Sequence, residues 1–173
     1  MVDLISDEQK VKPDSVFLKL QNGCKVTIKS HLVRLFTYFD NSKKKTILWS
    51  ELLNQPKRQE FYYWVELQIG EDKTEGIARI PGPIFFSMNE NERLLEKDKR
   101  CFVWIISKQG EGLKTKYEAV RGVDAPEITA DIIDSNSKKL QQILTGYESK
   151  LAEGLRNYLE EQKVDVKKKK KLT

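Results

Sequence analysis

One stretch, "EFYYWVELQIGED" (residues 60–72), constrains the fold more than any other part of the chain. Its side chains alternate with a period of two, which is the period of an extended strand whose two faces meet different surroundings. The face expected to be core consists of Phe61, Tyr63, Val65, Leu67 and Ile69. The opposite face consists of Tyr62, Trp64, Glu66 and Gln68. Two large aromatic rings are unusual on a face that meets only water, so this face is a candidate binding surface.

Two further strands are predicted before this stretch. Residues 24–40, "CKVTIKSHLVRLFTYFD", alternate at first and then become continuously apolar, which is typical of one long strand that bends between two environments. Residues 17–23, "FLKLQNG", are expected to form a short partner strand. The turn between them would lie at Asn22-Gly23, because this dipeptide favours the tight turns of hairpins.

A strand, a helix and two more strands are predicted after the aromatic strand. "GIARI" (76–80) ends at "PGP", whose prolines break a strand, and residues 84–99 then place apolar side chains at helical spacing. Residues 100–110 and 113–122 are expected to be two strands joined by a "GEG" hairpin turn. If the short partner strand (17–23) is set aside, five strands remain with a helix between the third and fourth. This is the element order of an OB-fold, a small, partly open Greek-key barrel that binds oligonucleotides.

The C-terminal part of the chain predicts a helix. Its apolar side chains recur three and four residues apart, which makes an amphipathic stripe. The stripe consists of Leu140, Ile143, Leu144, Tyr147, Leu151, Leu155, Tyr158 and Leu159. Gly146 and Gly154 each weaken a helix by about 1 kcal/mol relative to Ala, so this helix is expected to need a packing partner. The stripe fits docking on the barrel and a seam between two subunits equally well.

The predicted organisation has four parts. They are a flexible N-terminus (1–11), an OB-like barrel (12–122), a helical extension (123–163) and a disordered basic tail (164–173). This tail, quoted with Lys163 as "KVDVKKKKKLT", is most simply a solvated end of the chain. Nonspecific phosphate contacts, or a nuclear address in a eukaryotic host, are the alternatives.

Charge and composition narrow the class of function. The chain has a formal net charge of +5, and residues 12–122 contain 20 basic against 14 acidic residues, which favours a polyanionic partner. Cys24 and Cys101 lie far apart without metal-ligand spacing, so neither a disulfide framework nor a zinc site is expected. No apolar run approaches the roughly 20 residues that cross a bilayer, and the N-terminus is too polar for a signal peptide. We therefore expect an intracellular protein without a membrane partner, cytoplasmic or, in a eukaryote, nuclear.

Two motifs resemble a known family. "EGIARIPGPIFFSM" leads from an isoleucine-rich strand into a helix, and "CFVWIISKQGEGLKTKY" joins a hydrophobic strand to a Thr-x-Tyr strand through a basic, glycine-containing turn. Over residues 60–122 this pattern resembles the OB-fold single-stranded DNA-binding proteins of phage and mobile elements. The resemblance implies binding of single-stranded DNA with low sequence specificity in replication, recombination or repair. Tetrameric bacterial single-strand binders usually end in an acidic, partner-recruiting tip, whereas this chain ends in "KKKKKLT", so their protein recruitment is not carried over.

Sequence-tolerant binding of a single strand requires a positive groove for phosphates and aromatic faces on which bases stack, at roughly 1–3 kcal/mol per base. The candidate nucleic-acid-binding residues are Lys29, Arg34, Tyr62, Trp64, Arg79, Lys108, Lys114, Lys116, Tyr117 and Arg121. The alternative for Tyr62 and Trp64 is burial beneath the C-terminal helix. Tyr117 could equally be core, and Trp104, between Val103 and Ile105, is expected to be core. Because stacking and phosphate contacts serve either polymer, the choice between DNA and RNA stays open.

An enzyme and a structural or adaptor subunit are the two other classes of function. Catalysis has little support, because His31 is the only histidine and no Walker-type glycine loop is present. A metal-dependent nuclease built on Asp14 and Glu66 lacks the lysine that such a core requires, so no enzyme, cofactor or metal is expected. The alternative is a structural or adaptor subunit that binds protein partners, or a second copy of itself, through the barrel and the C-terminal helix.

Overall fold

The computed structural model describes residues 16–93, 102–110, 116–122 and 127–172. The chain forms two compact units, which are described separately. The first unit comprises Met1–Val33 and Phe61–Gln141, and the second comprises Arg34–Glu60 and Gln142–Thr173. The predicted fold class is confirmed at the coarse level, since the described residues are mainly β with a C-terminal helix.

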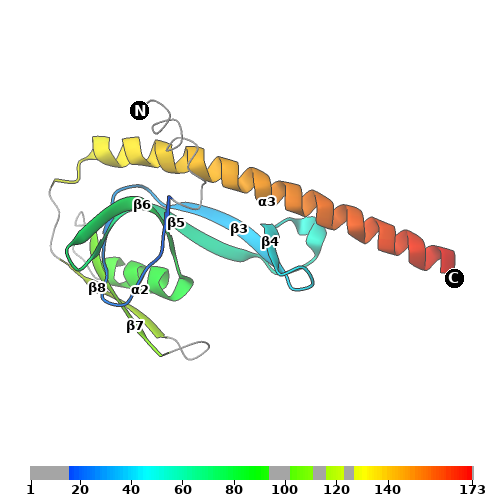
Figure 1. Cartoon of the computed structure of the whole chain (residues 1–173), viewed down its shortest axis with the longest axis horizontal. Coiled ribbons are helices and arrows are strands. Elements are labelled where there is room, and N and C mark those ends of the chain that lie inside the picture. Colours follow the sequence, from blue (N-terminus) through cyan, green and yellow to red (C-terminus); the bar gives the residue numbers. More distant parts are fainter. Residues whose placement is uncertain (1–15, 94–101, 111–115, 123–126, 173) are drawn as a thin grey trace. The chain divides into compact units, whose positions relative to one another are not determined.

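The elements follow one another along the chain in the order drawn in Figure 1. They are β1 (Phe17–Leu18), β2 (Lys25–Ile28), β3 (Val33–Asp40), β4 (Lys45–Leu48), the 3₁₀ turn η2 (Glu51–Leu53), β5 (Arg58–Ile69), β6 (Asp72–Ile80), α2 (Gly82–Arg93), β7 (Val103–Gln109), β8 (Lys116–Arg121) and α3 (Ala130–Leu172). The single long strand predicted over residues 24–40 is therefore two strands, and β4 and η2 lie where no element was predicted. The α3 backbone continues through the lysines of the tail, which were expected to be disordered.

The first unit is built on a mixed sheet with the strand order β1-β6-β5-β2-β7-β8. Strand β2 pairs antiparallel with both β5 and β7, and β5 pairs antiparallel with β6. The strands β7-β2-β5-β6 thus have the spatial order of a Greek key, in which the fourth strand returns to lie beside the first. The strand with the alternating aromatics, β5, is central in this sheet, as its buried apolar face requires.

The sheet is open and does not close into a barrel, so the predicted OB-like barrel is not confirmed. Strand β1 pairs with β6 in parallel, with Phe17 opposite Ile77, rather than forming the predicted hairpin with residues 24–40. This pairing depends on Gly76, because a Cβ there would lie 2.4 Å from the carbonyl oxygen of Val16. Among the described strands, β1 and β8 end the path, and β1 occupies the edge of β6 that a closing β8 would need. The turn predicted at Asn22-Gly23 does form, with φ of +79° at Gly23.

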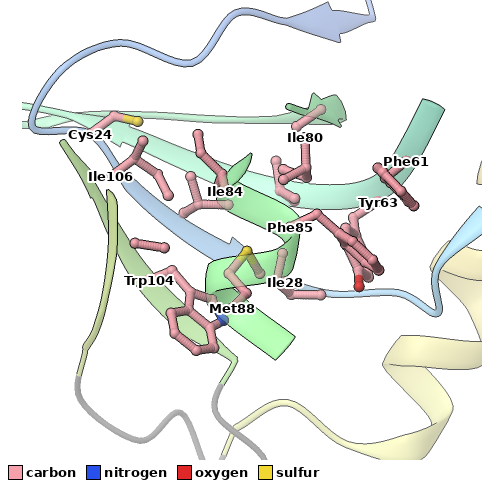
Figure 2. Packing of buried hydrophobic residues seen from close by; sticks show 14 of the residues in the cluster. Cys24, Ile28, Phe61, Tyr63, Ile80, Ile84, Phe85, Met88, Trp104 and Ile106 are labelled. Atoms are coloured by element: carbon pink, nitrogen blue, oxygen red, sulfur yellow. The ribbon is translucent and has the colours of Figure 1, made fainter. Parts of the chain in front are cut away.

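The core of the first unit lies between the sheet and α2 (Figure 2). The face of β5 that was expected to be core is buried from Phe61 to Leu67, whereas Ile69 at the strand end is 39% exposed. Phe61 stacks on Phe85 of α2 with ring centroids 3.9 Å apart. Trp104 of β7 is fully buried, as predicted. Burial of large apolar side chains stabilises this unit by roughly 1.5–3 kcal/mol each.

The second unit contains the β3–β4 hairpin and the C-terminal part of α3. Asp40 pairs with Lys45 across a four-residue turn, and its carboxylate accepts hydrogen bonds of 3.0 Å from the backbone N–H and the hydroxyl of Ser42. Lys44 completes the turn in the left-handed region with φ of 54°. These contacts are those of an Asx turn followed by a left-handed residue, which fixes the hairpin register.

Helix α3 packs against this hairpin through part of the predicted apolar stripe. Leu144 and Leu151 are buried, and the Tyr38 and Tyr158 rings meet edge to face with centroids 6.1 Å apart. Gly154 allows a close approach, because a Cβ there would lie 2.9 Å from Cγ2 of Ile47. The expectation that the helix needs a packing partner is therefore met within the chain.

Candidate nucleic-acid interface

The predicted stacking surface begins with Tyr62 on the outer face of β5. This side chain is only 2% exposed, and its ring meets the edge of Phe17 with centroids 6.1 Å apart. The addition of β1 to the edge of β6 brings Phe17 to this position. Tyr62 therefore has no open face for a base, which corrects its predicted role.

Trp64, two residues further along the same face, is half-buried and lies next to the start of α3. The ammonium group of Lys139 is 5.7 Å from the centroid of its ring, within cation–π range. The side-chain amide of Asn136 donates to the Lys29 carbonyl at 3.1 Å, and the His31 backbone N–H donates to the Ser137 hydroxyl at 2.9 Å. These contacts hold the first turns of α3 beside Trp64. The alternative of burial beneath the C-terminal helix is met only in part, because the ring is half-buried.

Lys29 is predicted to bind phosphate, but its charge is already paired. Its ammonium group lies 3.1 Å from a carboxylate oxygen of Glu66 and 3.3 Å from one of Glu75. Burial alone would lower the pKa of Lys29, yet hydrogen bonds and charge interactions with the two glutamates leave that pKa raised. Residues 61–80 contain four acidic against two basic residues. On the outer face itself Glu66 and Glu75 are matched by Lys73 and Arg79, and the two glutamates engage the Lys29 ammonium group, so a phosphate would have to compete with them for this lysine.

The other predicted residues lie on several elements. Arg79 is exposed opposite the buried Tyr62, and Lys116 is exposed on β8. Tyr117 packs against the core cluster, which is the alternative that the sequence left open for it. The remaining predicted residues are Arg121, exposed at the end of β8; Arg34, exposed on β3; Lys108, whose backbone pairs with Tyr117; and Lys114, which lies outside the described residues.

A second aromatic cluster, not predicted from the sequence, lies in the second unit at the base of the β3–β4 hairpin. The backbone N–H of Trp49 donates to the Phe36 carbonyl at 3.0 Å, so these two residues are cross-strand neighbours. The ammonium group of Lys57 lies 4.6 Å from the centroid of Phe36 and 5.5 Å from that of Trp49. We call Phe36, Trp49 and Lys57 the hairpin platform.

Local backbone chemistry brings Lys57 back over the two rings. The Ser50 hydroxyl caps η2 by accepting from the Leu52 N–H, and Asn54 ends the turn in the left-handed region with φ of 52°. The Trp49 indole N–H donates to the Gln55 carbonyl at 2.8 Å, which fixes the ring against the returning chain. Both rings are half-buried and Lys57 is exposed, so the platform lies at the surface of its unit.

The electrostatics of this segment differ from those of β5 and β6. Residues 34–60 contain six basic against three acidic residues. Two of the three carboxylates, those of Asp40 and Glu60, are buried, whereas Lys45 and Arg58 are exposed. Positive charge beside half-exposed aromatic rings is the chemistry that binds single-stranded nucleic acid. The sequence pattern did not identify this cluster, because the pairing of Phe36 with Trp49 depends on the strand register.

A metal-binding cluster, a membrane-spanning helix or a reactive thiol would indicate another class of function. No group of three or more His, Cys, Asp or Glu side chains that could hold a metal ion occurs within the described ranges. The part of the chain that the structure describes has no helix with both the length and the apolar composition for crossing a bilayer. Burial raises the pKa of the Cys24 thiol, against smaller opposing contributions from backbone hydrogen bonds, so this group has little thiolate character.

Comparison with known proteins adds no family to these observations. No protein-family model matches the chain, and neither the curated proteins nor the solved structures contain a significant match.

Proposed function

We propose that the protein binds single-stranded nucleic acid with little sequence preference, and that bases stack on the hairpin platform. The observation that supports this most is the geometry of Lys57 over the adjacent rings of Phe36 and Trp49. Each base stacked on an aromatic ring contributes roughly 1–3 kcal/mol, and every base has a face to stack. Nearby lysines and arginines would neutralise phosphates without reading sequence.

The finer fold assignment is part of the same proposal. A Greek key followed by a fifth strand, with a helix between the third and fourth strands, is the arrangement of an OB-fold. Strands β2, β5, β6, β7 and β8 and helix α2 correspond to it, with the barrel left open between β6 and β8. OB-folds bind oligonucleotides through their second and third strands and the loops beside them. In this chain the segment between β2 and β5, which contains β3, β4 and η2, would bind the oligonucleotide instead of the faces of the second and third strands.

The test is a fluorescence-anisotropy titration with labelled oligo-dT, in which two tryptophans are compared. Trp49→Leu should weaken binding about 5- to 150-fold, which corresponds to the loss of one stacked base. Trp64→Leu is the control, since Trp64 lies in the first unit and is not part of the hairpin platform, and it should leave the affinity within about twofold. Trp49→Phe keeps a ring face while removing the hydrogen bond to Gln55, so it should retain most of the binding.

Three results would contradict the proposal: no binding of oligo-dT, equal affinity for duplex DNA, or a larger loss from Trp64→Leu than from Trp49→Leu. Oligo-U measured beside oligo-dT decides between RNA and DNA, because both polymers stack on the same rings. Circular dichroism of each variant checks that the hairpin remains folded. A role in replication, recombination or repair belongs to this proposal and depends on the DNA arm of the titration.

A second candidate function is an adaptor that binds a protein partner through the same segment. Leu52, in the turn after Trp49, is 76% exposed, and burying this side chain against a protein partner would remove apolar surface from water. Leu52→Ser discriminates between the two functions. It should leave the oligo-dT affinity unchanged if nucleic acid is the ligand, whereas a protein partner retained by the intact chain and lost by this variant would support the adaptor.

A further inference from the structure

In the free protein the ring faces of the hairpin platform are not vacant. The Lys57 ammonium group lies within about 6 Å of both ring centroids, the range in which a cation is attracted to an aromatic face. A base that stacks on either ring from this side must therefore displace the lysine. Lys57 differs in this respect from Lys45, which is exposed on the same hairpin.

We propose that Lys57 is an exchanging residue of the site: it covers Phe36 and Trp49 in the free protein and moves to a phosphate when a base stacks on them. This inference rests on the proposed function. The side chain is exposed, and an ammonium group on a flexible stem can contact either an aromatic face or a phosphate, so the exchange replaces a ring contact with a phosphate contact. The exchange requires only a movement of the Lys57 side chain and no unfolding of the hairpin.

The exchange has opposite effects on the two components of binding. The phosphate contact strengthens binding at low salt and weakens as salt rises, with a slope of about 0.7 per contact for a single strand. Displacing the ammonium group from the rings weakens binding by about two- to fivefold, a cost that changes little with salt. An ordinary phosphate-binding lysine has only the first effect.

The removal of Lys57 should therefore make binding weaker at low salt and tighter at high salt. For Lys57→Ala, the slope of log affinity against log salt should fall in magnitude by about 0.7. A slope difference of about 0.7 changes the affinity ratio about fivefold over a tenfold range of salt, so the variant should be about two- to threefold weaker than wild type at the lowest salt and about twofold tighter at the highest. Lys45→Ala is the matched control, which should reduce the slope similarly and bind more weakly than wild type at every salt concentration.

The experiment is an anisotropy titration of the full chain with oligo-dT between about 50 and 500 mM NaCl. The same variants are compared without nucleic acid by acrylamide quenching in a Trp64→Phe background, where Trp49 is the quenchable tryptophan because the remaining Trp104 is fully buried. Lys57→Ala should increase the quenching and Lys45→Ala should not. Crossing affinity lines together with increased quenching support the exchange.

The possible failures are distinguishable. If the wild type binds oligo-dT but Lys57→Ala is weaker at every salt concentration, as expected for Lys45→Ala, the exchange is wrong and the proposed function stands. If the quenching of Trp49 does not change, Lys57 does not cover the ring and the exchange is wrong. If the wild type fails to bind oligo-dT, the proposed function is wrong and the exchange falls with it.

Discussion

Two glycines of α3 allow the packing of this helix against the hairpin to be measured. Gly146 has open space around it, with no atom within 4 Å of an added Cβ, whereas a Cβ at Gly154 would lie 2.9 Å from Cγ2 of Ile47. Ile47 is buried and β-branched, so this methyl group cannot rotate away easily. The two positions therefore share one helix and one substitution, and they differ only in what the new methyl group meets.

The expected free energies follow from these surroundings. Gly→Ala in a helix contributes about 1 kcal/mol, so Gly146→Ala should stabilise the protein by about that amount. At Gly154 the same gain is set against overpacking, which typically costs about 1–3 kcal/mol, so Gly154→Ala should change stability by about 0 to −2 kcal/mol. The difference between the two variants should thus be about 1–3 kcal/mol.

Urea unfolding followed by circular dichroism measures both variants against wild type. Gly154→Ala should also disturb the Tyr38–Tyr158 ring contact one turn away, which tyrosine fluorescence or NMR would detect. Equal stabilisation by the two substitutions would refute the reasoning, because it would mean that α3 does not approach Ile47 closely. In that case the conclusion that α3 packs against the β3–β4 hairpin would also be wrong.

Three further predictions concern the first unit. Gly76→Ala should cost at least about 1–3 kcal/mol in unfolding free energy, because the new Cβ would meet a backbone oxygen at 2.4 Å, while Gly82→Ala has open space and should cost less than about 1 kcal/mol. The raised pKa of Lys29 means that its ion pairs stabilise the protein fully below the ordinary value of 10.5 and are lost as pH rises through the folded-state pKa, so Lys29→Met should flatten the alkaline decline of the melting temperature. Cys24, buried and with a raised pKa, should react with a thiol reagent far more slowly in the folded protein than in urea, measured in a Cys101→Ser background; equal rates would contradict its burial.

The sequence predicted those parts of the fold that depend on local periodicity. Alternation along β5 identified the buried face from Phe61 to Leu67, and the apolar spacing identified α3 and its need for a packing partner. The pairing of β1 with β6 was missed because a two-residue strand has no periodicity of its own. Its position depends on a close approach at Gly76 that only the folded structure reveals.

The candidate site was harder to predict for the same reason. Tyr62 and Trp64 were identified correctly as lying on the outer face of β5, but alternation cannot show which other segment covers that face. Phe17 and Lys139, far away in the sequence, are the residues that occupy it. Trp49 becomes a neighbour of Phe36 only through the register of the β3–β4 hairpin, which a sequence pattern does not specify.

The central claim is that single-stranded nucleic acid contacts the second unit at the hairpin platform. Ultraviolet cross-linking of the full chain to oligo-dT, followed by mass spectrometric mapping of the modified peptide, tests this claim most directly. The account predicts adducts on Phe36 or Trp49, and their loss when unlabelled oligo-dT competes. Adducts confined to Trp64, or to other residues of β5 and β6, would contradict it.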